Sequence, residues 1–112
     1  MNLSENKLNT MDISPQEQIF LLLSQIPQGR FTTYGRLAKM LPGVHARQVA
    51  RMLSQLPEGT QLPWHRVVNS QFKVADFHGR GEQSARLTAE GLLVSASGRL
   101  PKEKLWPDEH GF

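Results

Sequence analysis

The sequence holds four histidines and no cysteine, and this limits the chemistry that its side chains can perform. Without cysteine the chain has no disulfide, no thiolate metal site and no thiol nucleophile. The histidines stand apart, at spacings that fit no metal-ligand pattern on a helix or a loop. They are His45, His65, His78 and His110. We therefore expect no metal ion and no cofactor.

Positive charge is concentrated in one stretch of the chain, although the net charge of the whole sequence is only +3. Between Gln18 and Pro57 every charged side chain is basic. These side chains are Arg30, Arg36, Lys39, Arg47 and Arg51. Unopposed positive charge favours a polyanionic ligand, because each neutralised phosphate releases condensed counterions. The alternative is a solvated basic surface without a ligand, and the position of these residues on the helices decides between the two.

The first predicted element is a helix whose two ends are marked in the sequence. Ser14, Pro15 and Glu17 form a start signal, in which the serine is the N-cap, the proline takes the first helical position and the glutamate closes a capping box. An apolar run that reaches Ile26 then predicts one buried helix face. Pro27-Gln28-Gly29 ends this helix.

Two short helices follow, and their spacing is typical of a helix-turn-helix. The pattern predicts a helix over residues 34–40, capped by Thr33, and a second helix over residues 45–56 after a Pro-Gly turn. In a helix-turn-helix the second helix contacts DNA. Arg47 and Arg51 lie four residues apart on it and share one face, largely away from the apolar stripe. The alternative is a helical hairpin that contacts nothing else.

The second half of the chain predicts short extended segments around one more helix. Residues 62–68 favour a short strand or an extended loop, which doubles back at an Asn69-Ser70 turn into residues 72–74. A helix follows over residues 82–90 and ends at a glycine, and residues 92–100 are a candidate hairpin or wing. The predicted fold class is mainly α with minor β, a winged helix-turn-helix-like DNA-binding domain.

Length and composition suit one soluble domain. The chain has 112 residues, of which 38% are apolar. We expect residues 13–112 to form the domain and residues 1–12 to be a flexible tail. No apolar run approaches the length of a membrane span, and the polar N-terminus lacks the features of a secretory signal. We therefore expect a cytoplasmic, nucleoid-associated monomer with no membrane partner.

Residues 63–70, Pro-Trp-His-Arg-Val-Val-Asn-Ser, resemble the active-site signature of the DNA alkyltransferases that remove alkyl groups from O6-alkylguanine. In that signature a cysteine stands where this chain has Trp64. Three more segments resemble motifs of the same family and occur in the same order, within a resemblance that spans residues 15–91. They are Phe31-Thr32-Thr33-Tyr34-Gly35, Ala46-Arg47-Gln48-Val49 and Ala89-Glu90-Gly91. The chain is similar to the alkyltransferase-like proteins, the branch of this superfamily that has tryptophan in place of cysteine.

The resemblance implies a DNA damage sensor that is not an enzyme. Such a protein binds double-stranded DNA containing O6-alkylguanine, flips the damaged base into a pocket and passes the lesion to UvrA-type nucleotide excision repair proteins. By alignment, His65 and Glu90 correspond to the histidine and glutamate that activate the cysteine. With Trp64 in the cysteine's place they form a vestigial network without a nucleophile.

The resemblance also assigns roles to individual residues. Tyr34 corresponds to the tyrosine that presses on the phosphate 3′ to the lesion. Arg47 corresponds to the arginine that fills the gap left by the flipped base, for which a guanidinium is better suited than an amine. The further DNA-binding candidates are Thr33, Gln48 and Arg51. The expected lesion pocket consists of Pro63, Trp64, Asn69, Val74, Ala75 and Phe77, where the indole offers an apolar stacking surface.

Three alternatives remain at the level of the sequence. In the first, the chain is a winged-helix regulator without lesion specificity. In the second, it is an alkyltransferase that uses another nucleophile such as Ser70. The third alternative concerns Trp64 alone: the indole fills the site of the missing cysteine as an ordinary core side chain.

Overall fold

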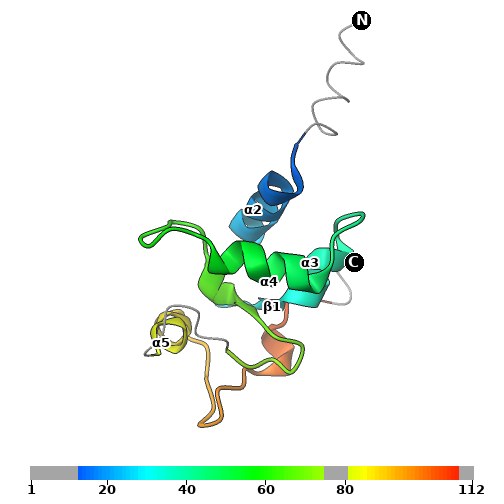
Figure 1. Ribbon diagram of the computed structural model, residues 1–112. Helices are drawn as coiled ribbons and strands as arrows, with labels where there is room; N and C mark the ends of the chain where they lie inside the picture. Colours follow the sequence, from blue (N-terminus) through cyan, green and yellow to red (C-terminus); the bar gives the residue numbers. More distant parts are fainter. Residues whose placement is uncertain (1–12, 75–80, 109–112) are drawn as a thin grey trace, which may run out of the picture.

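The computed structural model describes residues 13–74 and 81–108, which form a mainly helical domain with two short strands (Figure 1). The predicted fold class is therefore confirmed. The predicted flexible tail, residues 1–12, lies outside the described residues. In chain order the elements are α2 (Pro15–Gln25), β1 (Thr32–Thr33), α3 (Tyr34–Lys39), α4 (Ala46–Ser54), the 3-10 helix η1 (Trp64–Arg66), β2 (Val67–Val68), α5 (Glu82–Ala89) and the 3-10 helix η2 (Lys102–Lys104).

The helices begin where the sequence places their capping residues. At the start of α2, the Ser14 hydroxyl accepts the Glu17 N–H at 3.2 Å, and the Glu17 carboxylate accepts the Ser14 N–H at 3.3 Å. This is the predicted capping box. At the start of α3, the Thr33 hydroxyl accepts the Arg36 N–H at 3.1 Å. Gly29, with φ of 82°, provides the left-handed conformation that the turn after α2 requires.

The helix-turn-helix is formed by α3 and α4, which pack against each other and against α2. Figure 1 shows α4 with α3 beside it, α2 above it and α5 below it. The predicted stripe of α4 faces the core, since Val49 and Leu53 are fully buried. The two helices end within two residues of their predicted limits, and the turn between them uses Gly43 with φ of 74°.

The segment before Asn69 differs from its prediction. Residues 62–68 were predicted as one strand or extended loop, but Trp64–Arg66 form a 3-10 helix and only Val67–Val68 are extended. This β2 strand pairs in parallel with β1, with Thr32 opposite Val67 and Thr33 opposite Val68. The prediction was wrong because a parallel pairing between distant segments leaves no period in the local sequence.

For residues 92–100, predicted as a hairpin or wing, the structure shows a different pairing from that of a hairpin. Residues 95–99 do form a turn, in which the Ser95 N–H donates to the Arg99 carbonyl at 3.0 Å. Beyond the turn, the partner of this segment is not Leu92–Val94 but the segment around Lys73, through an antiparallel bridge between Lys73 and Arg99. A second core cluster lies under this bridge and consists of Phe31, Val68, Leu87, Leu92 and Leu100.

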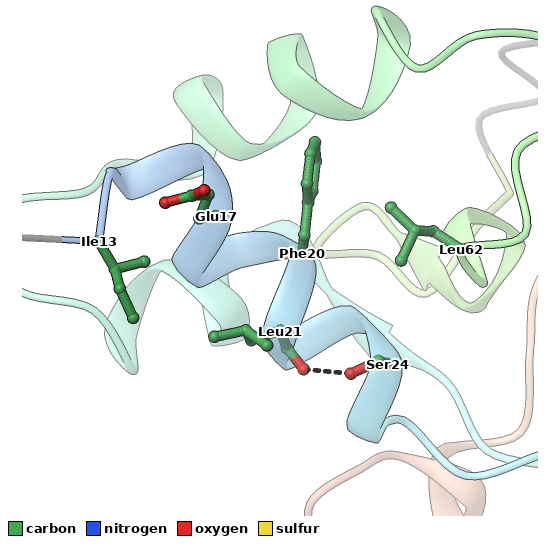
Figure 2. Close-up of a pocket in the computed structure, with 6 residues that line it drawn as sticks. All are labelled: Ile13, Glu17, Phe20, Leu21, Ser24 and Leu62. Atoms are coloured by element: carbon green, nitrogen blue, oxygen red, sulfur yellow. Dashed lines mark hydrogen bonds between the residues drawn. The ribbon is translucent and has the colours of Figure 1, made fainter. Parts of the chain in front are cut away.

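The outer side of α2 has a shallow apolar hollow of about 420 Å³ (Figure 2). Its lining residues are Ile13, Glu17, Phe20, Leu21, Ser24 and Leu62. Leu21 is 52% exposed, whereas Ile19 and Leu23 on the other side of the helix are fully buried. The helix thus has the single buried face that its apolar run predicts. In the described part of the chain, no helix has the length and apolar character that a membrane span needs.

Candidate nucleic-acid interface

The exposed face of α4 carries the two arginines that the sequence assigns to it. Arg47 and Arg51 are exposed, while Val49 on the same helix is fully buried. Together with His45 and Gln48 they line a hollow on the surface. Neither arginine forms an ion pair with an acidic side chain among the described residues. The face therefore presents uncompensated positive charge to solvent.

Two of the five basic residues between Gln18 and Pro57 have a structural task instead. Arg30 donates to the carbonyls of Lys104 and Leu105 at 3.1 and 3.0 Å. Arg36 donates to the carbonyl of Pro107. These two arginines hold the C-terminal segment against the domain. The positive charge that remains on the surface from this stretch comes from Lys39, Arg47 and Arg51.

The other predicted DNA-binding residues are partly engaged within the protein. Tyr34 is only 9% exposed and belongs to the first core cluster, and this burial raises its pKa, so its hydroxyl stays protonated. The Thr33 hydroxyl caps α3, as described above. The Gln48 side-chain oxygen accepts the His45 N–H at 2.8 Å and caps α4. Their roles at DNA stay predictions, while their roles in fixing the two helices are visible.

Trp64 is 2% exposed and belongs to the first core cluster. The guanidinium of Arg86 lies over its ring, 5.5 Å from the ring centroid. Arg86 is held there by Glu82, one turn earlier on α5, at 2.9 Å. Sequence reasoning missed Arg86, although its spacing of four residues from Glu82 marks it as part of a helical ion pair. The indole is therefore a covered side chain with a cation over its ring.

One carboxylate accepts hydrogen bonds from three residues, two of which directly follow Trp64 in the sequence. Glu90 accepts hydrogen bonds from His65 Nε2 at 2.7 Å, from the Arg66 guanidinium at 2.7 and 3.0 Å, and from the Gly29 N–H at 3.0 Å. Arg66 also donates to the Ile26 carbonyl at 2.8 Å. The structure thus brings the predicted pair of His65 and Glu90 together. It also gives Arg66 a structural role, which the sequence left open between structure and DNA contact.

The network fixes the protonation states of its members. Burial by itself would raise the pKa of Glu90, but the hydrogen bonds from Arg66, Gly29 and His65 outweigh it and lower the pKa to about 2. Burial lowers the pKa of His65 below its usual value, against the opposing effect of Glu90. With Nε2 donating to the carboxylate, the neutral ring has an acceptor at Nδ1, which is buried and has no hydrogen-bond partner among the described residues. The arrangement could activate a thiol, and this chain has none.

Acidification is expected to destabilise the fold in two steps. The folded-state pKa of His65 is lowered. The contribution of His65 to the free energy of unfolding is therefore present above the ordinary histidine pKa of 6.5 and is lost as the pH falls below that value. The contribution of Glu90 is complete above 4.5 and is lost as the pH falls towards 2, a loss of up to about 3 kcal/mol. Urea unfolding at about pH 7.5, 5.5 and 3.5 measures both steps. An unchanged free energy of unfolding across this range would contradict the assignment.

The predicted lesion pocket is described in part. Pro63 and Trp64 lie together at the start of η1, and Val74 is half-buried against the second core cluster. Asn69 uses its side-chain oxygen to accept the N–H groups of Gln71 and Lys73 at 2.9 and 3.0 Å, so it holds the turn after β2. The predicted pocket residues Ala75 and Phe77 lie outside the described residues.

One further buried side chain was missed by sequence reasoning. Gln83 of α5 is fully buried, and its amide donates to the carbonyls of His65 and Val67 at 3.1 and 2.9 Å. It attaches α5 to the segment that carries Trp64. No signal in the sequence separates this glutamine from a solvent-exposed one, because its partners are backbone atoms of a distant segment.

The fold and the site together define a helix-turn-helix domain of the DNA-binding class, with an internal His-Glu-Arg network and no thiol. The family model of the 6-O-methylguanine DNA methyltransferase, DNA binding domain, matches residues 14–92. The chain belongs to this family, within its alkyltransferase-like branch.

Two relatives and one solved structure show the same relationship. The chain is 47% identical over 91 residues to the DNA base-flipping protein of Vibrio parahaemolyticus, covering 78% of this chain and 89% of that protein. It is 41% identical over 103 residues to the DNA base-flipping protein of Escherichia coli, covering 89% and 78% of the two chains. Its structure matches that of Schizosaccharomyces pombe Atl1 in complex with damaged DNA containing O6-carboxymethylguanine, with a TM-score of 0.71, 28% identity and coverage of 83% and 94%.

Proposed function

We propose that this protein is a non-enzymatic DNA damage sensor, which binds DNA containing O6-alkylguanine and holds the flipped base beside Trp64. The observation that carries the proposal is the exposed arginine face of α4, which has no acidic partner in the part of the chain that the structure describes, in a chain without cysteine. The names of the relatives in Vibrio parahaemolyticus and Escherichia coli support base flipping. The complex of Schizosaccharomyces pombe Atl1 with O6-carboxymethylguanine DNA supports lesion binding.

Binding would proceed through the helix-turn-helix. The face of α4 meets the DNA, Arg47 enters the base stack and Tyr34 presses on the neighbouring phosphate. Extruding a base costs a few kcal/mol and costs least at a damaged pair, so the protein favours lesions without reading much sequence. Trp64 then offers apolar contacts to the alkylated base. Because the indole is 2% exposed, we expect the contacts around it to rearrange when the base enters.

We also propose that the protein does not transfer the alkyl group from the DNA to one of its own side chains. Alkyl transfer needs a nucleophile beside an activating base, and the position next to His65 is occupied by an indole instead of a thiol. Ser70 is an exposed residue beyond β2 and lies on the turn that Asn69 holds. We propose that the network of His65, Arg66 and Glu90 acts only in holding the fold around Trp64.

The downstream partner and the location are part of the same proposal. We propose that the bound complex marks the lesion for UvrA-type nucleotide excision repair proteins, and that the protein acts as a cytoplasmic, nucleoid-associated monomer. These points rest on the likeness to alkyltransferase-like proteins.

The deciding experiment is a titration of a duplex containing O6-methylguanine against its unmodified parent, at one defined salt concentration. We expect the lesion duplex to bind about tenfold more tightly or better, because the damaged pair lowers the cost of extrusion. Purely electrostatic binding would not separate the two duplexes. Equal affinity for the lesion duplex and the unmodified duplex would reject the damage sensor. If the protein then also preferred a symmetric DNA site, the result would support a winged-helix regulator.

A parallel incubation with a duplex that carries a labelled alkyl group tests the absence of the reaction. We expect all of the label to remain on the DNA. Transfer of the label to the protein, or its release, would show an alkyltransferase or hydrolase that uses another nucleophile.

A further inference from the structure

Two basic residues that lie far apart in the sequence face each other directly across an antiparallel bridge. Lys73 pairs with Arg99. The flanking hydrogen bonds run from the Val74 N–H to the Gly98 carbonyl at 3.0 Å, and from the Leu100 N–H to the Phe72 carbonyl at 2.8 Å. This pattern makes Lys73 and Arg99 a non-hydrogen-bonded pair, in which the Cα atoms are only about 4.5 Å apart.

Their side chains must point to the same side of the bridge, and that side faces away from the core. In an extended pair, neighbouring side chains alternate between the two faces. Val74, which follows Lys73, packs against the second core cluster, and Leu100, which follows Arg99, is 3% exposed within it. Lys73 and Arg99 therefore lie on the opposite face. Lys73 is half-buried and Arg99 is exposed.

Two like charges directly opposite each other destabilise a strand pair. Among the residues that the structure describes, neither side chain has an acidic partner: the ion pairs there join His65 and Arg66 to Glu90, and Arg86 to Glu82. The bridge thus concentrates two cations at one point, and none of the described acidic side chains forms an ion pair with either of them. A phosphate group compensates such a pair, because it accepts hydrogen bonds from both a lysine and an arginine.

We propose that Lys73 and Arg99 form a clamp for the phosphodiester backbone of duplex DNA, separate from the arginines of α4. The clamp rests on the proposed function, since it gives the same DNA a second point of attachment. In Figure 1 the two segments that carry the pair lie below α4. The clamp contacts phosphate and reads neither the sequence nor the lesion, so its role is to add affinity and orientation.

The test compares two double variants with equal changes of charge. Lys73→Gln/Arg99→Gln removes the clamp, and Lys102→Gln/Lys104→Gln removes two exposed lysines from η2 as the matched control. Affinity for the unmodified duplex and for the O6-methylguanine duplex is measured over a range of salt concentrations. Because each neutralised phosphate contributes about 0.9 to the slope of log K against log salt, loss of the clamp is expected to reduce that slope by about 1.8. The control is expected to keep the slope of the unaltered protein.

The experiment distinguishes a failure of the proposed lesion preference from a failure of the proposed clamp. Loss of the clamp is expected to weaken both duplexes by the same factor, which leaves the ratio of their affinities unchanged. A slope equal to that of the control variant would overturn the clamp, whatever the lesion preference is. Equal affinity for the two duplexes in the unaltered protein, together with a reduced slope in the clamp variant, would overturn the sensor and leave the clamp.

A thermal melt of each variant separates the clamp from a structural role. Removing two opposed cations relieves repulsion, so the melting temperature of Lys73→Gln/Arg99→Gln is expected to stay the same or rise. A lower melting temperature with an unchanged salt slope would show that the pair is compensated within the protein, and would overturn the proposal.

Discussion

Replacing Arg47 with alanine is expected to weaken binding to O6-methylguanine DNA by roughly 10- to 100-fold. The physical reason is that Arg47 lies on the exposed face of α4, where its guanidinium can both stack in the gap left by a flipped base and donate hydrogen bonds. Alanine removes the charge and the stacking surface together. Fluorescence anisotropy with the lesion duplex measures the loss.

Two control variants separate stacking from charge. Arg51→Ala removes an equal charge from the same face of the same helix, and Lys102→Ala removes one from η2. We expect Arg51→Ala to weaken the lesion and unmodified duplexes equally, as a phosphate contact does, and Lys102→Ala to change affinity by about twofold or less. Arg47→Ala should also reduce the ratio of the two affinities. If all three variants lose the same factor, Arg47 does not enter the stack.

Replacing Glu90 with glutamine is expected to lower the free energy of unfolding by about 3 kcal/mol or more. The glutamine keeps the shape of the side chain but leaves the Arg66 guanidinium, whose side chain is 16% exposed, without its counter-charge. Breaking a buried pair from one side costs the desolvation of the partner that remains. Because a domain of this size has a total stability of about 5 to 15 kcal/mol, the loss is a large fraction of the whole. Urea unfolding at neutral pH measures it.

The matched control is Glu82→Gln on α5. The Glu82–Arg86 pair has a comparable separation, 2.9 Å, but both side chains are 43% exposed. A solvent-exposed pair of this kind contributes about 0.3 to 0.5 kcal/mol. A loss for Glu90→Gln no greater than that for Glu82→Gln would show that the network does not hold the fold together.

The position of the network explains why its loss would be costly. Arg66 binds the carbonyl of Ile26 at the end of α2, and Glu90 binds the N–H of Gly29 in the turn that follows. The network thus ties η1, the end of α5 and the end of α2 to one another. In a chain without cysteine, His65 and Glu90 have a structural task that is independent of any reaction.

The helix ends show how much of the fold follows from local chemistry. Ser14 with Glu17, and Thr33 at the start of α3, cap their helices as predicted, because a cap depends on residues within three positions of each other. The exposed placement of Arg47 and Arg51 was likewise predictable, since 3.6 residues per turn fix which side chains share a face. The recognition of the family rests on motifs that are also local, such as residues 63–70.

The roles of Arg66, Gln83 and Arg86 were not predictable from their neighbours in the sequence. Arg66 meets Glu90 and the Ile26 carbonyl, and Gln83 meets backbone atoms of the segment around Trp64. Arg86 lies over an indole from another element. Each of these contacts joins segments that are distant in the chain, so no spacing rule identifies it.

Three features follow from the amino-acid sequence without the structure. The chain has no thiol, Trp64 stands before His65, where the related alkyltransferases have cysteine, and two arginines share one face of a helix. These are properties of composition and of helical period. Three other features become visible in the folded chain: the indole is covered and has a cation over its ring, β2 pairs with β1, and Lys73 and Arg99 oppose each other. The physical reason is that burial and long-range pairing depend on which segments meet when the chain closes on itself, and local sequence patterns do not encode that choice.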